Sequence, residues 1–325
     1  MCRSRDIRAL LGEQLMKTRW KLAIALLVTL AALVPPACDA GRDSAGGSRA
    51  LELNAFVTAA DLAVGVNRFP FVLVDTNGEA AVGASVRAKF AKLGEDGAPT
   101  VKSSGEAVFV SVTSEFLHVH EDGFEHIHEH VEGVYVVNGV DFDEAGFWEA
   151  EFEVKREGIG TTTASAAFEV RERPIAPGVG EMAPASRNPT AGDVEDLYEI
   201  STHPSPVPGL YQLTIAEALE QRKPLVVAFS TPAFCVSRAC GPMTDLVVSL
   251  YEGYGDRINF IHIEPWVLET ARGEGRLVLT DVAKEWRLVS EPWVFVIDAE
   301  GRVASRFEGF LGEEEMVEAL EAVVP

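Results

Sequence analysis

The stretch that most constrains this chain is residues 223–243, KPLVVAFSTPAFCVSRACGPM. The continuous apolar run at 225–229 is typical of a strand that is covered on both faces. A loop with Cys235 and Cys240 follows. Beyond Gly241 and Pro242, the apolar residues of 243–251 recur at helical spacing, and a proline is favoured near a first helical turn. The pattern predicts a buried strand, a cysteine loop and a helix in direct succession.

A cysteine between a strand and a helix has a chemical reason to be there. The helix N-terminus presents unpaired N–H groups and a partial positive charge, which stabilise a thiolate over a thiol. A second cysteine nearby can resolve the mixed disulfide that the first one forms, and Arg238 between them would add positive potential if it points inward. We therefore expect thiol–disulfide chemistry at Cys235 and Cys240; the alternative is a structural disulfide or two inert thiols.

The same stretch resembles the thioredoxin-like superfamily, together with Pro292 ahead of a strand-like run and a turn at 298–302. Residues 179–184 are similar to the opening of the redoxin branch, so the resemblance runs from about residue 179 to the end of the chain. It implies an α/β thioredoxin-like fold over 209–325 and a cis-proline at Pro292 that holds the substrate backbone near the sulfurs. It also implies a redox step that needs no cofactor, with extracytoplasmic protein thiols or disulfides as partners.

The spacing of the cysteines departs from the usual C-x-x-C of that family, because four residues separate Cys235 from Cys240. A second alignment sets 240–243 on C-G-P-C, which puts Cys240 at the nucleophile position and Met243 where the resolving cysteine belongs. A third sets 237–240 on the peroxiredoxin T/S-x-x-C, with Pro232 too far upstream. Which cysteine attacks therefore stays open, and the third alignment makes a peroxiredoxin-like peroxidase an alternative function.

The N-terminal residues have the features of an export signal. A basic segment at 16–21 precedes an apolar run at 22–34 that is short for a membrane-spanning helix. Ala37 before Cys38 resembles the bacterial lipobox, although Pro35 stands where leucine is usual. The resemblance implies that 1–37 is a lipoprotein signal peptide and that Cys38 is lipidated. An ordinary signal peptide or an N-terminal membrane anchor are the alternatives, and Met16 is a candidate start.

These features predict an extracytoplasmic protein, anchored to the cell membrane through lipid, or secreted if it is not lipidated. The Gly- and Ser-rich residues up to 50 make 38–50 a flexible tether. With Cys2 removed and Cys38 lipidated, only Cys235 and Cys240 would remain, which favours a pair. The formal net charge of -22 argues against nucleic acid as a partner, because phosphate binding needs a basic surface.

Residues 51–172 show short strand-like runs separated by turns, including Asn-Gly at 77–78, and no long helix. This pattern predicts an immunoglobulin-like β-sandwich, and the core aromatics we expect are Phe69, Phe71, Trp148 and Phe168. Seven prolines in 173–208 predict an extended linker. The expected fold class is thus two domains, an all-β immunoglobulin-like sandwich followed by the α/β thioredoxin-like fold.

Five of the seven histidines of the chain lie in 118–130, at His118, His120, His126, His128 and His130. In each cluster they recur at every second position, which places each row on one face of a strand. Imidazole suits copper or zinc. A hairpin with an odd loop would put both rows on one face, and an even loop would separate them. The alternatives are a copper- or zinc-binding or delivery lipoprotein and a solvated acidic hairpin tip.

Two local predictions complete the sequence reading. Residues 214–222 are expected to form a helix that opens with a capping box between Thr214 and Glu217. His262, alone in an apolar strand, is expected to be a packed core residue rather than a ligand.

Overall fold

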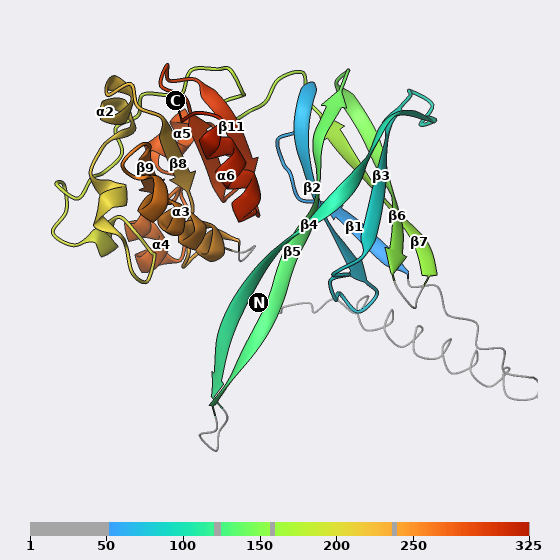
Figure 1. Cartoon of the computed structure of the whole chain (residues 1–325), viewed down its shortest axis with the longest axis horizontal. Helices are drawn as coiled ribbons and strands as arrows, with labels where there is room; N and C mark the ends of the chain where they lie inside the picture. The colour runs from blue at the N-terminus through green and yellow to red at the C-terminus, as the bar shows by residue number, and fades with distance from the viewer. Residues whose placement is uncertain (1–51, 120–124, 157–159, 236–238, 325) are drawn as a thin grey trace, which may run out of the picture. The chain divides into compact units, whose positions relative to one another are not determined.

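The structure is a computed structural model that describes residues 52–119, 125–156, 160–235 and 239–324 (Figure 1). Side chains are described outside 112–119 and 125–132. The described residues all belong to one compact unit, Ser48–Pro325. The predicted signal peptide, the lipidation site Cys38 and the tether lie outside the described residues. None of the helices in the described parts of the chain is long and apolar enough to cross a membrane.

Seven antiparallel strands form a single large sheet in the order β1-β2-β5-β4-β3-β6-β7 (Figure 1). Their bounds are β1 Leu53–Val57, β2 Gly65–Asp75, β3 Ser85–Leu93, β4 Pro99–Val119, β5 Glu125–Phe142, β6 Gly146–Arg156 and β7 Gly160–Val170. The two outer strands approach each other. Next to them, Val64 N donates to Arg171 O at 2.8 Å and Arg171 N donates to Leu62 O at 2.9 Å. The sheet therefore curls until it is nearly closed.

The expected fold class was wrong. The described chain is mostly β, and one nearly closed antiparallel sheet is its main element, in place of a two-sheet sandwich joined to an α/β thioredoxin-like fold. The reason is the continuity of β4. Its first half pairs with β3 from Pro99 to Ala107, and its second half pairs with β5 from Val108 to Val119. One 21-residue strand thus joins by hydrogen bonds the strands that we expected to divide between two sheets.

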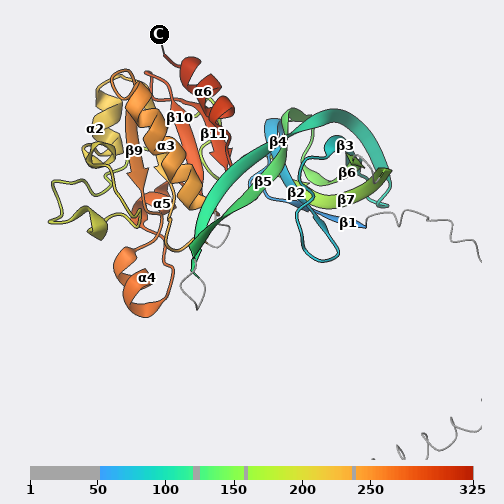
Figure 2. The ribbon, with the colours of Figure 1, turned by 60° about the horizontal axis from the view of Figure 1, so that its bottom comes forward.

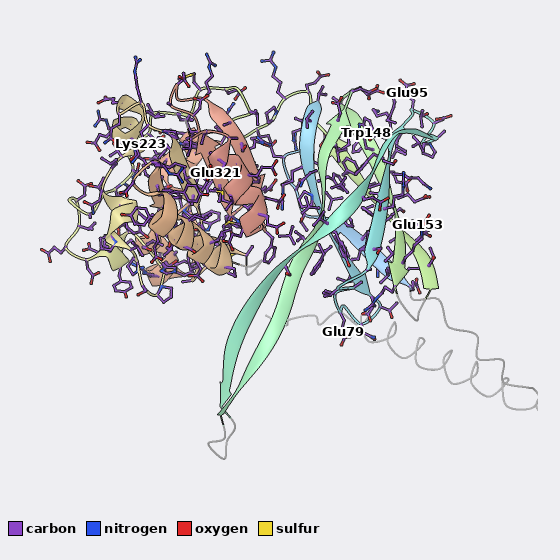
Figure 3. The ribbon with its side chains drawn as sticks, viewed as in Figure 1. Glu79, Glu95, Trp148, Glu153, Lys223 and Glu321 are labelled. Atoms are coloured by element: carbon purple, nitrogen blue, oxygen red, sulfur yellow. The ribbon has the colours of Figure 1, made fainter. Side chains whose placement is uncertain are left out.

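The interior of the seven-stranded sheet is aromatic, as predicted. Trp148 is fully buried (Figure 3), and its indole N–H donates to Glu144 O at 3.1 Å. Phe69 meets Phe168 with ring centroids 4.9 Å apart. Alternate residues of β6 point inward, because successive side chains of a strand lie on opposite faces. All four aromatic residues that the sequence singled out are buried in this core.

The C-terminal residues form a four-stranded sheet in the order β11-β10-β8-β9. The strands are β8 Leu225–Phe229, β9 Asn259–Ile263, β10 Trp293–Ile297 and β11 Val303–Glu308. Only the β8–β9 pair in it is parallel. Every residue of β8 is buried, as its continuous apolar run predicted.

Helices cover both faces of this sheet (Figure 2). Alternate residues of β8 pack against α2 Ile215–Glu220 and α5 Asp281–Glu285 on one face. The others pack against α3 Cys240–Tyr254 and α6 Glu313–Glu321 on the other. The remaining helices are α4 Leu268–Glu274 and the short 3-10 turns Leu197–Glu199 and Pro208–Tyr211. The capping box predicted before α2 is confirmed, with Thr214 and Glu217 exchanging both bonds.

Candidate active site: the cysteine pair at the start of α3

Sheet register brings the cysteine loop and Pro292 to the same edge of the four-stranded sheet. Phe229, the last residue of β8, pairs with Trp293, the first residue of β10. The loop that leaves β8 therefore begins beside Pro292, and the peptide bond between Glu291 and Pro292 is cis. The parallel partner β9 ends at the same edge, where Phe229 pairs with Ile263. Three chain segments thus converge around the cysteines.

The two cysteines lie close together and are not joined by a disulfide. Cys240 is the first residue of α3 and is fully buried, whereas Cys235 is half-buried. The backbone N–H of Cys240 donates to the Sγ of Cys235 at 3.4 Å. This N–H is one of the unpaired donors of a helix N-terminus, where the helix dipole also favours negative charge. Both effects stabilise a thiolate on Cys235.

The proton of the pair belongs on Cys240. A hydrogen bond to Cys235 and burial raise the pKa of the Cys240 thiol far above its ordinary value, and the negative charges of Cys235 and Glu291 add to the effect. The backbone N–H of Thr231 acts in the opposite direction and is outweighed. Because the pKa of the buried Cys240 thiol is raised, whereas the half-buried Cys235 sulfur accepts the Cys240 N–H, the geometry favours Cys235 as the attacking sulfur and Cys240 as the resolving one.

Glu291 belongs to the same site, and the sequence reasoning missed it. Burial raises the pKa of its carboxyl, and the charge on Cys235 raises that pKa further. A carboxyl held beside a thiolate is favoured in its protonated form. The one sequence signal that points to Glu291 is its position directly before Pro292.

A buried polar network ties the end of β8 to the start of α3. His262 Nε2 donates to Ser230 O at 3.1 Å, and its Nδ1 lies 2.8 Å from the hydroxyl of Tyr211. Ser230 Oγ lies 2.6 Å from Thr244 Oγ1, which donates to Cys240 O at 2.7 Å. The prediction that His262 is a packed core residue is confirmed, and its ring supports the backbone beneath the cysteines.

This network gives a pH-dependent stability. Burial lowers the pKa of His262 to about 4 from 6.5, so below pH 6.5 the unfolded chain binds a proton that the folded chain excludes. Between pH 7 and pH 4.5 this contributes a loss of about 2.5 kcal/mol in the free energy of unfolding. Urea unfolding of the wild type and of His262→Gln at pH 7 and pH 4.5 measures this contribution. The loss of free energy of unfolding between the two pH values is expected to be smaller by that amount in His262→Gln. Equal pH dependence in the two proteins would contradict this role.

The backbone register of the histidine hairpin favours one of the two predicted arrangements. Position 118 lies directly opposite position 126, so both belong to the same face of the two-stranded ribbon. Position 116 opposes 128, and 114 opposes 130. His118, His126, His128 and His130 thus share one face, and His120 lies outside the described residues. Among the residues whose side chains are described, no group of three or more His, Cys, Asp or Glu side chains is placed to hold a metal ion.

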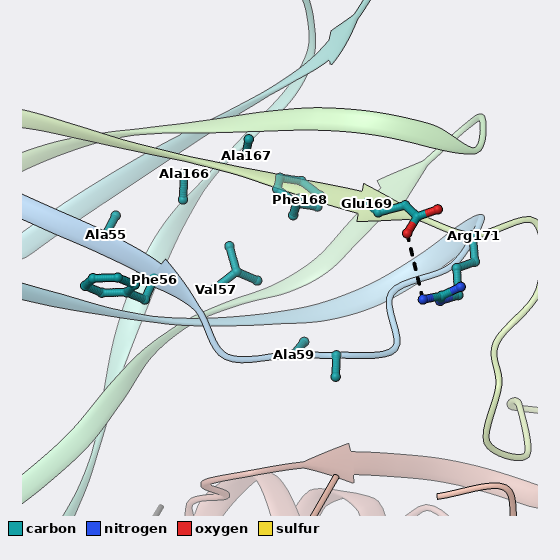
Figure 4. Close-up of a pocket in the computed structure, with 10 residues that line it drawn as sticks. Ala55, Phe56, Val57, Ala59, Ala166, Ala167, Phe168, Glu169 and Arg171 are labelled. Carbon is teal, nitrogen blue, oxygen red and sulfur yellow. Dashed lines mark ion pairs between the residues drawn. The ribbon is translucent and has the colours of Figure 1, made fainter. Parts of the chain in front are cut away.

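Two cavities are alternative candidate sites. One, of about 460 Å³, lies between β1 and β7 (Figure 4). It is lined mainly by alanines and holds one long ion pair between Glu169 and Arg171 at 3.8 Å. A second, of about 270 Å³, is lined by residues that include His262 of β9 and Trp266, which lies three residues after the end of β9. Neither cysteine lines either cavity, and the cysteine pair is the stronger candidate for chemistry.

No family model matches the chain, and no curated protein matches it. Among solved structures, a crystal structure of FetP from uropathogenic Escherichia coli, expressed recombinantly in the periplasm of E. coli, shares 7% identity with a TM-score of 0.18. The match covers 37% of this chain and 97% of that one. A likeness at this TM-score carries no argument about fold or function.

Proposed function

We propose that this chain is an extracytoplasmic, membrane-anchored thiol–disulfide oxidoreductase in which Cys235 attacks and Cys240 resolves. The observation that carries the proposal is the Cys240 N–H that donates to Cys235 Sγ at 3.4 Å, at the start of a helix and beside Pro292. The same arrangement does not favour the peroxiredoxin-like alternative, because that chemistry needs Cys240 as the reactive thiolate and the pKa of Cys240 is raised.

The reaction balances as two exchanges. The Cys235 thiolate attacks one sulfur of a substrate disulfide, so that a Cys235–substrate bond forms, the substrate S–S bond breaks, and the leaving thiolate takes a proton. Cys240 then loses its proton as it attacks Cys235, which forms the Cys235–Cys240 disulfide and releases the second substrate thiol. The substrate is reduced by two electrons and the protein is oxidised by two. A dithiol reductant returns the pair to the thiol form, and the same steps in reverse oxidise a substrate dithiol.

The proposal is tested by multiple turnover. The purified full chain is mixed with a disulfide-bonded protein substrate and excess dithiothreitol, and release of substrate thiols is followed. We expect release faster than with dithiothreitol alone and proportional to the concentration of the chain. Release at the rate of the reductant alone, with a pair that is nevertheless fully reduced, would overturn the proposal.

A second candidate function is supported by the hairpin register. The backbone register assigns His118, His126, His128 and His130 to one face of a two-stranded ribbon, and imidazole is a ligand that suits Cu(II) or Zn(II). A metal-binding or delivery role for the hairpin is compatible with redox chemistry at the cysteines, because different residues carry the two.

The metal proposal predicts a large effect from a cross-strand pair of substitutions. In His118→Ala/His126→Ala, the affinity for Cu(II) or Zn(II) is expected to fall by about 100-fold or more, since weakening even outer contacts of a metal site costs 10- to 100-fold. Calorimetric titration with each metal measures this. His203→Gln is the control, because His203 is bonded to Asp245 outside the hairpin. Equal weakening in the control, or no saturable binding by the wild type, would contradict the proposal.

A further inference from the structure

A buried carboxylate lies behind the cysteine loop, outside the set of residues that the exchange reaction uses. Glu264 directly follows β9 and is 5% exposed. Its Oε1 accepts from both the backbone N–H and the hydroxyl of Thr202, each at 2.6 Å. The same Thr202 hydroxyl accepts from the backbone N–H of Ala233 at 3.1 Å. Ala233 lies two residues before Cys235, so a continuous chain of hydrogen bonds joins the buried carboxyl to the cysteine loop.

The carboxyl of Glu264 also lies near Thr231, the second residue after β8. Glu264 Oε2 and Thr231 Oγ1 are both buried without a hydrogen-bond partner, yet the Thr231 hydroxyl is close enough to lower the pKa of Glu264 against the dominant effect of burial. The backbone N–H of Thr231 also acts to lower the pKa of the Cys240 thiol.

We propose that Glu264 is a positioning residue for the cysteine pair, holding the loop at Ala233 through Thr202. Without this hold, the loop moves relative to the start of α3, and Cys235 loses the Cys240 N–H that stabilises its thiolate. The inference rests on the proposed function of the pair for its biological meaning, but it concerns the state of the Cys235 sulfur and can be tested without a substrate.

The test is the rate of alkylation of Cys235 by iodoacetamide in the reduced full chain, measured against pH and assigned to the residue by peptide mapping. In Thr202→Val, which keeps the shape and removes the hydroxyl, we expect the rate at neutral pH to fall by about 5- to 10-fold, as for the loss of one hydrogen bond, and the thiolate titration to move to higher pH. Thr202→Ser restores the wild-type profile. Glu264→Gln also retains it, because the amide oxygen still accepts from Thr202.

The matched control is Thr280→Val. Thr280 caps α5 by accepting from Ala283 N at 3.2 Å, so its loss costs stability without touching the cysteine loop. A wild-type profile in Thr202→Val, or an equal change in Thr280→Val, would overturn the positioning role. If the profiles change as expected while the wild type fails to turn over a disulfide substrate, the positioning role stands and the proposed function fails. If the wild type turns over a disulfide substrate but the profile of Thr202→Val is unchanged, the proposed function stands and the positioning role is refuted.

Discussion

Replacement of Cys235 by serine is expected to reduce disulfide turnover to the background of the reductant, a loss on the order of 10³-fold or more, as when other enzymes lose their nucleophile. The reason is that the remaining thiol, Cys240, is fully buried and keeps its proton. Turnover of the protein disulfide substrate in excess dithiothreitol measures the effect. Cys38→Ser is the control and should turn over at the wild-type rate, since the proposed chemistry does not use Cys38.

Cys240→Ser separates attack from resolution. This variant keeps the attacking sulfur and lacks the resolving one, so it is expected to accumulate a mixed disulfide between Cys235 and the substrate, visible by mass spectrometry without reductant. If Cys235→Ser accumulates the mixed disulfide and Cys240→Ser does not, the two roles are exchanged and our assignment is wrong.

The largest effect on stability is expected at the centre of the seven-stranded sheet. Trp148→Ala removes a fully buried ring that packs against Phe142 with centroids 5.0 Å apart and leaves Glu144 O without its donor. We expect a loss of about 3–5 kcal/mol in the free energy of unfolding. Urea unfolding followed by far-ultraviolet circular dichroism measures the change. The comparison holds when the free energy of unfolding falls with urea concentration at the same slope in the variant and the wild type.

The neighbouring residue supplies the control for this prediction. Phe147 is 65% exposed, so Phe147→Ala is expected to change the free energy of unfolding by about 0.5 kcal/mol or less. Because the two side chains belong to the same strand and differ in the face they occupy, similar losses in the two variants would contradict the described register of β6.

Local sequence patterns predicted the parts of this fold that depend on local physics. The apolar run of β8, the capping box between Thr214 and Glu217, and the burial of His262 each follow from a few adjacent residues. The pairing of strands does not. The sequence predicted short strands separated by turns and a histidine hairpin, whereas β4 runs without a break from Pro99 to Val119. β4 pairs with β3 along its first half and with β5 along its second half, and this change of partner produces one continuous sheet instead of a two-sheet sandwich. No residue pattern in β4 predicts the change.

The candidate site divides in the same way. Cys235, Cys240 and Pro292 were found from residue types and spacing, but which sulfur carries the proton depends on a contact across the turn. Glu264 was missed because its hydrogen-bond partner Thr202 lies 62 residues away in the sequence. Buried acceptors of this kind become visible only when the strand that carries them is placed.

The central claim is that Cys235 and Cys240 form a reactive pair, and a redox titration of the full chain tests it most directly. The chain is equilibrated across a series of glutathione ratios and the fraction of thiols is determined. We expect a reversible two-electron transition at a potential above about -300 mV, the region of exchange proteins rather than of structural disulfides. Two results would contradict the claim: a disulfide that is still not reduced at potentials below that value, or two cysteines that form no disulfide at any glutathione ratio.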